Sequence, residues 1–303
     1  MQEQARSMVL ASFVADSLAL GAHWIYDTAK IDQQFGRITE LFSPREGTYH
    51  PSKNLGDFTH YGDQSFHLLE HLTTHDGHFD ITEYSRDWQT FMTKYQGYID
   101  MASKETLKNL EEGKGPETCG SRSTDLGGPA RIAPLIYCYR ENLDEMLTAV
   151  KAQIAFTHSG PGVLDGAVFL ARSCHAVLLG ATPREAFEQI LAETVDSSEL
   201  HLRLRNCLEP ALTTDTRLQI KEFGQACAIN AALPGAMYTV LKNEDSLEEA
   251  LIETVMAGGD SAARGMVVGM LLGAYQGRDK IPPHWLEKLS RYKQIMGALD
   301  QLP

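Results

Sequence analysis

The sequence predicts a single all-α domain over residues 1–303, built from a dozen or more helices. Apolar residues recur at helical spacing almost without a break from residue 143 to residue 257. No alternating run of apolar and polar residues is long enough to predict a useful strand. The chain also carries no internal repeat, low-complexity tract or linker-like segment, which favours one compact domain.

The composition narrows the class of protein. The net charge of −13 argues against a nonspecific nucleic-acid surface, although a local basic pocket for a phosphate stays open. Five scattered cysteines without a C-x-x-C pair are typical of reduced thiols. No apolar run is long enough to span a membrane, and the first residues do not resemble a secretory signal. We expect a cytoplasmic protein that binds neither nucleic acid nor membrane; its oligomeric state is not specified.

The first predicted helix covers residues 4–22. Ala11, Ala15 and Ala19 form a row of small residues along it, and Asp16 lies one position further, near the core. A buried carboxylate must be paired, hydrogen-bonded or bound to a metal. Asp16 therefore either ties down a neighbouring loop or supports a functional site.

An irregular loop is predicted over residues 31–60, because this stretch lacks periodicity and contains several prolines and glycines. Long loops of this kind are often functional. The loop leads into a helix that starts near Asp63 and ends near Thr74, so we expect Asp63 at a helix N-terminus.

Three histidines follow at four-residue spacing on that helix: His67, His71 and His75. Two histidines so placed could bind a metal. Since no further ligand type is specified, a solvated histidine face is the better interpretation. One or two amphipathic helices are expected over residues 80–112.

A glycine- and hydroxyl-rich loop over residues 119–135 enters the next helix. Backbone N–H groups at Gly127 and Gly128, together with Arg131, could hold a phosphate. The loop is not a Walker A motif, since it has no Gly-Lys-Ser/Thr. Beyond it, Thr157 and His158 interrupt the helical pattern. The later helices are predicted over residues 143–157, 163–179, 183–194, 198–208, 215–230, 234–242 and 246–257.

The stretch from residue 256 to residue 277 combines a glycine pair, an acid and a glycine-rich helix. Gly258-Gly259 suits a tight turn with positive φ, which would present Asp260 at a helix N-terminus. Behind it, glycines recur at every fourth position: Gly265, Gly269, Gly273 and Gly277. Glycine costs a helix interior about 1 kcal/mol relative to alanine, so this row predicts close approach of another helix.

Five motifs in this order resemble the ADP-ribosylglycohydrolase family. They are Ser12-Phe-Val-Ala-Asp-Ser-Leu18, Gly62-Asp-Gln-Ser65, Gly127-Gly-Pro-Ala-Arg-Ile-Ala-Pro-Leu135, Phe156-Thr-His158, and the stretch from Gly258-Gly-Asp-Ser to Gly277. The resemblance covers nearly the whole chain. It implies a compact all-α fold, often with a dinuclear Mg²⁺ site, and hydrolytic release of ADP-ribose from a modified side chain or small molecule.

The acids that this resemblance requires are only partly present. Of the family's Thr-Asp-Asp-Thr and Gly-Gly-Asp-Thr-Asp-Thr patterns, only Asp63 and Asp260 keep their carboxylates here. Because Mg²⁺ needs several oxygen ligands, these two acids could hold one ion at most, or none. Arg264 could then replace the metal, with its guanidinium between the two acids, unless that side chain points into water.

One branch of the family, which includes the jellyfish lens J-crystallins and selenoprotein J, resembles this chain in further sequence motifs. It is similar at Leu20-Gly-Ala-His-Trp-Ile-Tyr-Asp27, Thr59-His-Tyr-Gly-Asp-Gln64, Phe223-Gly-Gln-Ala-Cys227 and Gly258-Gly-Asp-Ser-Ala-Ala-Arg264. Lens recruitment implies that some members are structural proteins. Cys227 and His23 could alternatively supply a thiolate and its base.

The resemblance therefore predicts a hydrolase that acts on an ADP-ribosylated or related small-molecule substrate, with a reduced Mg²⁺ site or none. The alternative is a catalytically inactive, crystallin-like structural or ligand-binding descendant. A pair of carboxylates can also serve metal-free glycosidic hydrolysis. The expected catalytic residues are Asp16, Asp63 and Asp260, with Asp63 and Asp260 as the metal ligands. The expected substrate-binding residues are His23, Gln64, Gly127, Gly128, Arg131, Thr157, His158 and Arg264.

Overall fold

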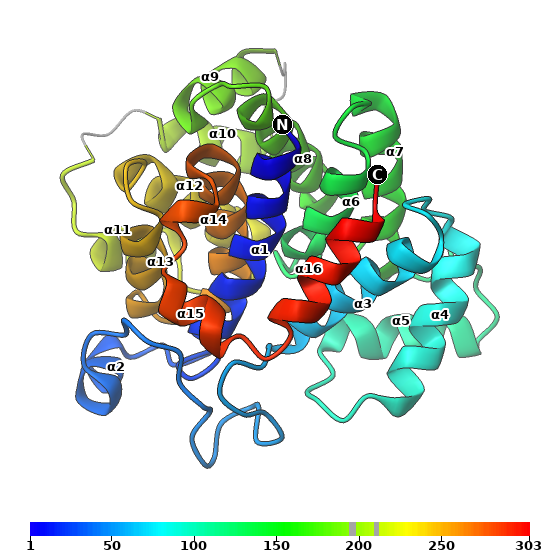
Figure 1. Cartoon of the computed structure of the whole chain (residues 1–303), viewed down its shortest axis with the longest axis horizontal. Helices are drawn as coiled ribbons and strands as arrows, with labels where there is room; N and C mark the ends of the chain where they lie inside the picture. Colours follow the sequence, from blue (N-terminus) through cyan, green and yellow to red (C-terminus); the bar gives the residue numbers. More distant parts are fainter. Residues whose placement is uncertain (194–197, 209–211) are drawn as a thin grey trace.

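The all-α prediction is confirmed. The computed structural model describes residues 1–193, 198–208 and 212–303. Within these ranges the chain forms sixteen α-helices, two short 3-10 helices and no β-strand, with two isolated β-bridges between loops (Figure 1). None of the described helices has the length and apolar character needed to cross a bilayer.

The helices follow one another with short connections over most of the chain. The first group is α1 (Gln2–Ala19), α2 (Thr28–Phe35), α3 (His60–Thr74), α4 (Ile81–Lys94), α5 (Met101–Glu111), η1 (Pro129–Arg131), α6 (Ala133–Cys138) and α7 (Leu143–Thr157). The second group is α8 (Val163–Leu178), α9 (Pro183–Glu193), α10 (Glu199–Asn206), α11 (Thr216–Phe223), α12 (Ile229–Lys242), α13 (Leu247–Met256), α14 (Ser261–Gln276), η2 (Arg278–Lys280), α15 (Pro283–Lys288) and α16 (Tyr292–Gln301).

Helices α1 and α14 pack against each other through the middle of the molecule. The predicted close approach is confirmed at Gly269 and Gly273 of the glycine row. A Cβ atom added at Gly269 would lie 2.5 Å from the carbonyl oxygen of Ala11. A Cβ at Gly273 would lie 2.7 Å from that of Ser7. Gly277 differs from the others in the row, because it ends the helix with a φ of 82°.

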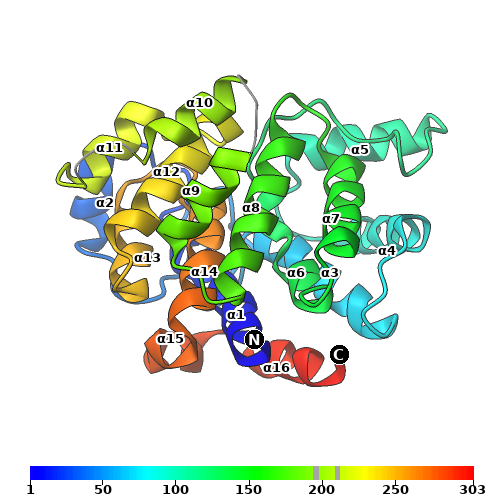
Figure 2. The same ribbon diagram turned by 90° about the horizontal axis from the view of Figure 1, so that it is seen from above.

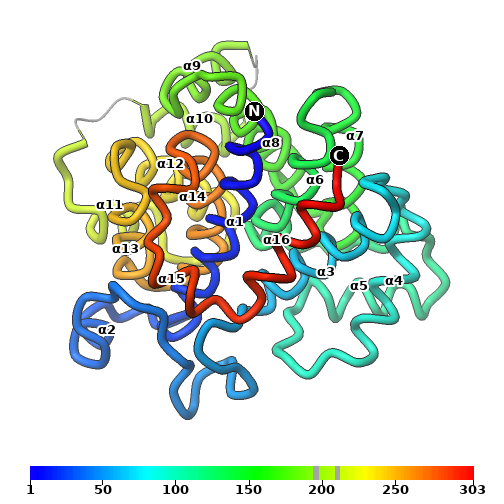
Figure 3. The backbone as a smooth tube through the Cα atoms, viewed as in Figure 1, coloured from blue at the N-terminus to red at the C-terminus, as the bar shows by residue number. Residues whose placement is uncertain are grey.

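The remaining helices lie on two sides of this central pair (Figure 2). Helices α9 to α13 gather on one side and α3 to α7 on the other, with α8 between them. After α14 the chain returns through α15 and α16, which contact α1 and α3 respectively (Figure 3). The two helix starts that carry Asp63 and Asp260 are thereby held by one continuous core.

Several predicted boundaries are wrong. The loop expected over residues 31–60 overlaps α2, which Asp27 caps by accepting a hydrogen bond from the N–H of Ala29 at 3.1 Å. The single helix expected over residues 215–230 is two helices, because Gly224 takes a φ of 106° after α11 and the chain resumes helical structure in α12. The end of the helix predicted over residues 183–194 lies outside the described residues.

The solvated histidine face predicted on α3 is also wrong. His71 is only 2% exposed, and its Nδ1 lies 2.7 Å from a carboxylate oxygen of Asp87. The half-buried ring of His67 stacks on Phe91 at 4.5 Å. Both partners belong to α4, which packs over this side of α3. The spacing located the three side chains on one face but could not show that another helix covers it.

Candidate functional site

Asp260 is placed by the glycine pair that precedes α14. Gly258 and Gly259 have φ values of 69° and 68°, which confirms the predicted turn. Gly259 exchanges hydrogen bonds with the loop after α1, donating to Ile25 at 2.8 Å and accepting from Trp24 at 3.0 Å. A Cβ at Gly259 would overlap the carbonyl oxygen of Gln225. The turn is therefore fixed on both sides, and Asp260 caps the helix as expected.

The carboxylate of Asp260 is completely buried and has two side-chain partners. Tyr61 on α3 donates its hydroxyl to Oδ2 at 3.0 Å. His23 places Nε2 3.0 Å from Oδ1, and since a carboxylate only accepts, that nitrogen carries the proton. Burial alone would raise the pKa of Asp260, but the hydrogen bond from His23 and the nearby charge of Arg264 outweigh it and lower the pKa. We infer that Asp260 is ionised.

Asp125 is the neighbouring acid, and the sequence analysis missed it. Its loop is joined to the loop before α12, because the N–H of Leu126 donates to the carbonyl of Cys227 at 2.8 Å. Ligand atoms of Asp125, Cys227 and Asp260 all lie within 4.8 Å of one another. Burial and the Asp260 charge raise the pKa of Asp125 to about 7. The signal in the sequence was the Asp-x-Gly turn, in which Asp125 accepts from the N–H of Gly127 at 2.7 Å.

The two carboxylates thus have pKa values displaced in opposite directions. Two acids whose environments separate their pKa values can divide the acid and base roles in catalysis. Asp125 is partly exposed as a residue, whereas Asp260 and Tyr61 are buried. The Tyr61 hydroxyl also lies 3.5 Å from both carboxylate oxygens of Asp125. We call Asp125, Asp260 and Tyr61 the carboxylate centre.

Asp16 holds the start of α3. It is fully buried and accepts hydrogen bonds from the N–H of Thr59 at 2.7 Å and from its hydroxyl at 2.5 Å. A Cβ at Gly62 would overlap the Asp16 carboxylate, so glycine is needed there. Burial raises the pKa of Asp16 to about 7. Of the two interpretations of Asp16, these contacts support the one in which it ties down a neighbouring segment.

Asp63 lies in the first turn of α3, as predicted, but it belongs to a different network from Asp260. It pairs with the ammonium group of Lys53 and accepts a hydrogen bond from the Tyr95 hydroxyl at 2.6 Å. With Lys53, Tyr95 and Arg291 it lines a cavity of about 420 Å³. Burial raises the pKa of Asp63 while Lys53 opposes that rise.

The arrangement of Asp63 and Asp260 does not fit the shared Mg²⁺ site that was expected. One Asp63 oxygen already binds both a lysine ammonium and a phenol, and the Asp260 oxygens bind Tyr61 and His23. Magnesium requires several free oxygen ligands converging on one point. The carboxylates instead face separate sets of protein donors.

Arg264 does not lie between the two acids, nor does it point into water. It is fully buried, and its guanidinium donates to the backbone carbonyls of Gly258 and Thr254. Its positive charge contributes to the lowered pKa of Asp260. The expectation failed because Asp63 is already paired with Lys53, whereas the carbonyls at the end of α13 offer acceptors to Arg264.

Four predicted substrate-binding residues form one buried network. Arg131 donates to Gln64 Oε1 and to Thr157 Oγ1, the latter at 2.9 Å, and Thr157 Oγ1 lies 2.8 Å from Nδ1 of His158. All four side chains are at most 3% exposed. Burial lowers the pKa of His158 to about 3, and the Arg131 charge adds to this effect. The structure brings these residues together, but they bind one another; their contact with a ligand stays a prediction.

The two glycines of the predicted phosphate loop lie in close contact with the side-chain rings of Tyr61 and His158. A Cβ at Gly127 would overlap the Tyr61 ring, and one at Gly128 would come 2.9 Å from the imidazole of His158. The N–H of Gly127 is already bound by Asp125. Phosphate binding by this loop likewise stays a prediction.

Cys227 and His23 do not form the nucleophile and base pair considered as an alternative. Burial and the charges of Asp125 and Asp260 raise the pKa of the Cys227 thiol, which disfavours a thiolate. The two ring nitrogens of His23 are bound to Asp260 and His50 instead. That alternative is wrong.

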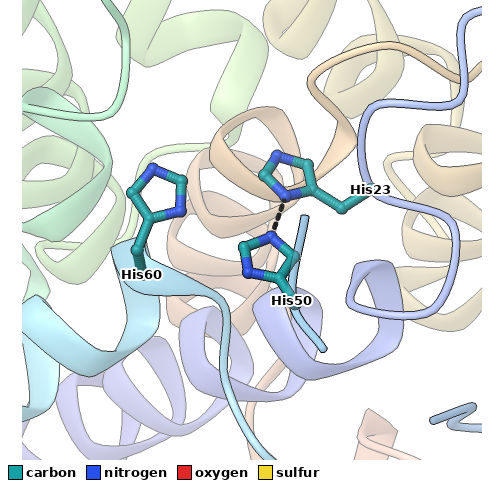
Figure 4. A group of neighbouring side chains, drawn as sticks. All are labelled: His23, His50 and His60. Atoms are coloured by element: carbon teal, nitrogen blue, oxygen red, sulfur yellow. Dashed lines mark hydrogen bonds between the residues drawn. The ribbon is translucent and has the colours of Figure 1, made fainter. Parts of the chain in front are cut away.

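His23 also belongs to a group of three buried histidines. His50 from the loop before α3 and His60 from the first residue of α3 point toward it (Figure 4). The sequence analysis named only His23, since nothing in the spacing of the three residues joins them. Among the described residues this is one of three groups whose ligand atoms could converge on a metal ion.

Comparisons with known proteins agree with the fold and with the family resemblance. The ADP-ribosylglycohydrolase family model matches residues 1–303. Crystallin J1A of Tripedalia cystophora is 24% identical over 317 residues, which cover 99% of this chain and 96% of that protein. ADP-ribosylhydrolase ARH3 of Homo sapiens is 25% identical over 207 residues, or 58% of this chain and 56% of that protein.

A solved structure, described as an ADP-ribosylglycohydrolase-related protein complex, shares the fold with a TM-score of 0.74. It is 21% identical and the match covers 99% of this chain and 96% of that one. With the family match over the full length, these findings confirm the resemblance on which the site prediction was based. The chain belongs to the ADP-ribosylglycohydrolase family, a family of hydrolases.

Proposed function

We propose that this protein hydrolyses a glycosidic bond to ADP-ribose or a related nucleotide sugar at the carboxylate centre. The observation that carries the proposal is the pair formed by Asp125 and Asp260. The pKa of Asp125 is raised to about 7 and that of Asp260 is lowered, although their carboxylate oxygens lie within 4.8 Å of each other. Glycosidic hydrolysis commonly uses one protonated and one ionised carboxyl group.

The roles follow from the protonation states. Asp125 gives its proton to the leaving group as the bond to the ribose carbon breaks. The ionised Asp260 stabilises the positive charge that develops on the ribose ring. Asp125, now a carboxylate, takes a proton from the attacking water and returns to its starting form. Tyr61 and His23 keep Asp260 in place throughout.

Aromatic side chains beside the centre suit a nucleotide base. The ring of Trp24 lies 4.8 Å from that of Tyr49 and 5.0 Å from that of Tyr98, measured between centroids. Tyr49 is 55% exposed, and Trp24 and Tyr98 are partly exposed. Exposed aromatic faces of this kind bind bases by stacking. These three rings support an adenine-containing substrate.

The proposed mechanism contains no step at magnesium, because the carboxylates of Asp63 and Asp260 bind different protein groups and do not fit one shared ion. The test is calorimetric titration of ADP-ribose, with EDTA and then with Mg²⁺, followed by hydrolysis assays on ADP-ribosylated substrates. Asp125→Asn and Asp260→Asn should abolish turnover, while Asp245→Asn, at an exposed acid outside the centre, should behave like the parent. Full turnover by both centre variants would place the site elsewhere.

A second candidate is a structural protein without turnover, as the likeness to Crystallin J1A suggests. The specific observation in its favour is that Asp63, Arg131 and Arg264 all have partners within the protein. A folded parent protein that neither binds nor hydrolyses ADP-ribose, with or without Mg²⁺, would support this candidate.

A further inference from the structure

The three-histidine group consists of His23, His50 and His60, which come from three separate segments. Their rings face one another, with centroids 5.1 to 6.0 Å apart (Figure 4). One ring nitrogen from each lies within 4.8 Å of the others. All three side chains are buried, at 3% exposure or less. A compact group of buried imidazoles needs a physical reason.

Several of their nitrogens lack partners. Neither ring nitrogen of His60, nor Nδ1 of His50, has a hydrogen bond to any described residue. Oδ2 of Asp100 lies 3.6 Å from Nε2 of His60, beyond hydrogen-bond range. Unpaired buried polar atoms are costly and uncommon, and a bound ion is one of their regular explanations.

We propose that His23, His50 and His60 bind a divalent transition-metal ion of the zinc class. Three imidazoles with an open fourth position form a ligand set found in catalytic zinc sites. Imidazole nitrogen suits zinc and related ions, whereas Mg²⁺ prefers oxygen. The site is therefore chemically distinct from the magnesium site that the acid motifs predicted.

One proton has to move for this ligand set to bind an ion. His23 uses Nε2 to donate to Asp260, so its Nδ1 lone pair accepts a hydrogen bond from Nε2 of His50, 2.8 Å away. On metal binding, the proton of His50 transfers to its unpartnered Nδ1, which frees Nε2 as a ligand. A histidine that ligates a metal through one nitrogen usually donates its other N–H to a carboxylate, as His23 does to Asp260.

The required movements are small. Nitrogens bound tetrahedrally to zinc lie about 3.3 Å from one another, given bond lengths of about 2.0–2.1 Å. The His23–His50 pair must open slightly from 2.8 Å, and its present hydrogen bond is replaced by two metal bonds. The other pairs, which lie within 4.8 Å, must close by at most about 1.5 Å. Rotation of the His50 side chain, which comes from a loop, can supply much of this.

The other two candidate groups are less suited. His71 in the group with His75 and Asp87 already has its Nδ1 bound to Asp87, and both partners are partly exposed. In the group of Asp125, Cys227 and Asp260, a metal would need the thiolate form of Cys227. The charges of the two carboxylates disfavour that form because they raise the pKa of the thiol. His75 therefore offers a matched control for a histidine variant, at a site of similar composition.

The test uses the purified full chain, stripped with EDTA and titrated with Zn²⁺ against a chromophoric chelator. We expect a single equivalent of zinc, and Co²⁺ should give the intense visible bands of a tetrahedral site. His50→Asn and His60→Gln should each weaken binding more than about 100-fold, since even outer-shell partners contribute about 10- to 100-fold. His75→Asn should leave the affinity unchanged.

Circular dichroism of each variant separates a lost metal ligand from a lost fold, and His50 lies in a loop outside the helices. Absence of a zinc equivalent in the folded parent overturns the proposal. So does retention of full affinity by His50→Asn, or loss of affinity in His75→Asn alone, which would move the ion to α3 and α4. Zinc binding does not depend on whether ADP-ribose is hydrolysed, so the two proposals fail independently.

Discussion

At the scale of single residues, neighbouring groups decide what each carboxylate can do. Asp125 and Asp260 are close enough for the charge on one to raise the pKa of the other. His23 and Arg264 compensate only Asp260, so the proton of the pair resides on Asp125. Asp63 is paired with Lys53 instead and takes no part in this division.

The pH dependence of hydrolysis should show this division. Asp125 must be protonated to act as the acid, and its pKa is about 7, so kcat/KM should fall as the pH rises through about 7. The lowered pKa of Asp260 keeps it ionised at mildly acidic pH, so no loss is expected there. A pH profile of kcat/KM tests both the fall near pH 7 and the constant rate at mildly acidic pH. A rate that increases through pH 7 would assign the opposite role to Asp125.

Replacement of Asp16 should destabilise the fold. Asp16→Ala leaves the N–H and hydroxyl of Thr59 buried without their acceptor, and each unsatisfied group costs about 1–3 kcal/mol. We expect a loss of about 3 kcal/mol in the free energy of unfolding, measured by urea denaturation. Asp27→Ala removes an exposed helix cap and should cost only about 1 kcal/mol. Equal losses in both variants would contradict the structural role of Asp16.

At the scale of elements, the contact between α1 and α14 organises the molecule. Small residues on both helices let the two backbones approach closely, and the turns that follow α1 and precede α14 are joined by backbone hydrogen bonds. The same contact thereby places His23 next to Asp260. A change in the spacing of these helices would be transmitted to the site.

Two glycines of α14 should respond in opposite ways to an added methyl group. Gly269→Ala forces Cβ against backbone atoms of Ala11 and should cost about 1–3 kcal/mol by overpacking. At Gly265 the nearest atom, the carbonyl oxygen of Ala15, is 3.4 Å away, so alanine should be neutral or gain up to about 1 kcal/mol in helix propensity. Thermal unfolding compares the pair. Equal destabilisation would mean that α1 approaches Gly265 as closely as Gly269.

At the scale of the whole molecule, the segment after α14 completes the core. Leu299 on α16 is fully buried, and its carbonyl accepts a hydrogen bond from Tyr137 of α6 at 3.0 Å. The sequence analysis assigns no helix after residue 277, although η2, α15 and α16 occupy that segment. These helices cover α1 and α3, and α3 carries Tyr61 of the carboxylate centre.

If this segment is part of one cooperative core, Leu299→Ala should lower the stability of the whole chain. A leucine-to-alanine change in a core costs about 2–5 kcal/mol. Leu218 is 63% exposed, and Leu218→Ala should change the free energy of unfolding by less than about 0.5 kcal/mol. Calorimetry should show one transition, shifted only in the first variant. An unchanged main transition in Leu299→Ala would show that α16 unfolds separately.

Local patterns in the sequence were enough to establish the fold class, most helices and the glycine turn at Asp260. Helical periodicity, a capping acid and glycines with positive φ can each be recognised within a few residues. The prediction over residues 143–157 matches α7, and Asp63 and Asp260 both lie at helix starts. The packing role of the glycine row could also be predicted from the sequence. Glycine destabilises a helix interior, so a row of glycines indicates that another helix packs closely against it.

Which groups face one another depended on contacts between segments that are distant in the chain. His23 and Asp260 are 237 residues apart, and no spacing in the sequence joins His50 and His60 to them. The same holds for Asp125, whose importance comes from the bridge between its loop and that of Cys227. Lys53 pairs with Asp63 and removes it from the site that the motifs predicted for it. Charges and hydrogen bonds act over a few ångströms of space, and folding alone sets those distances.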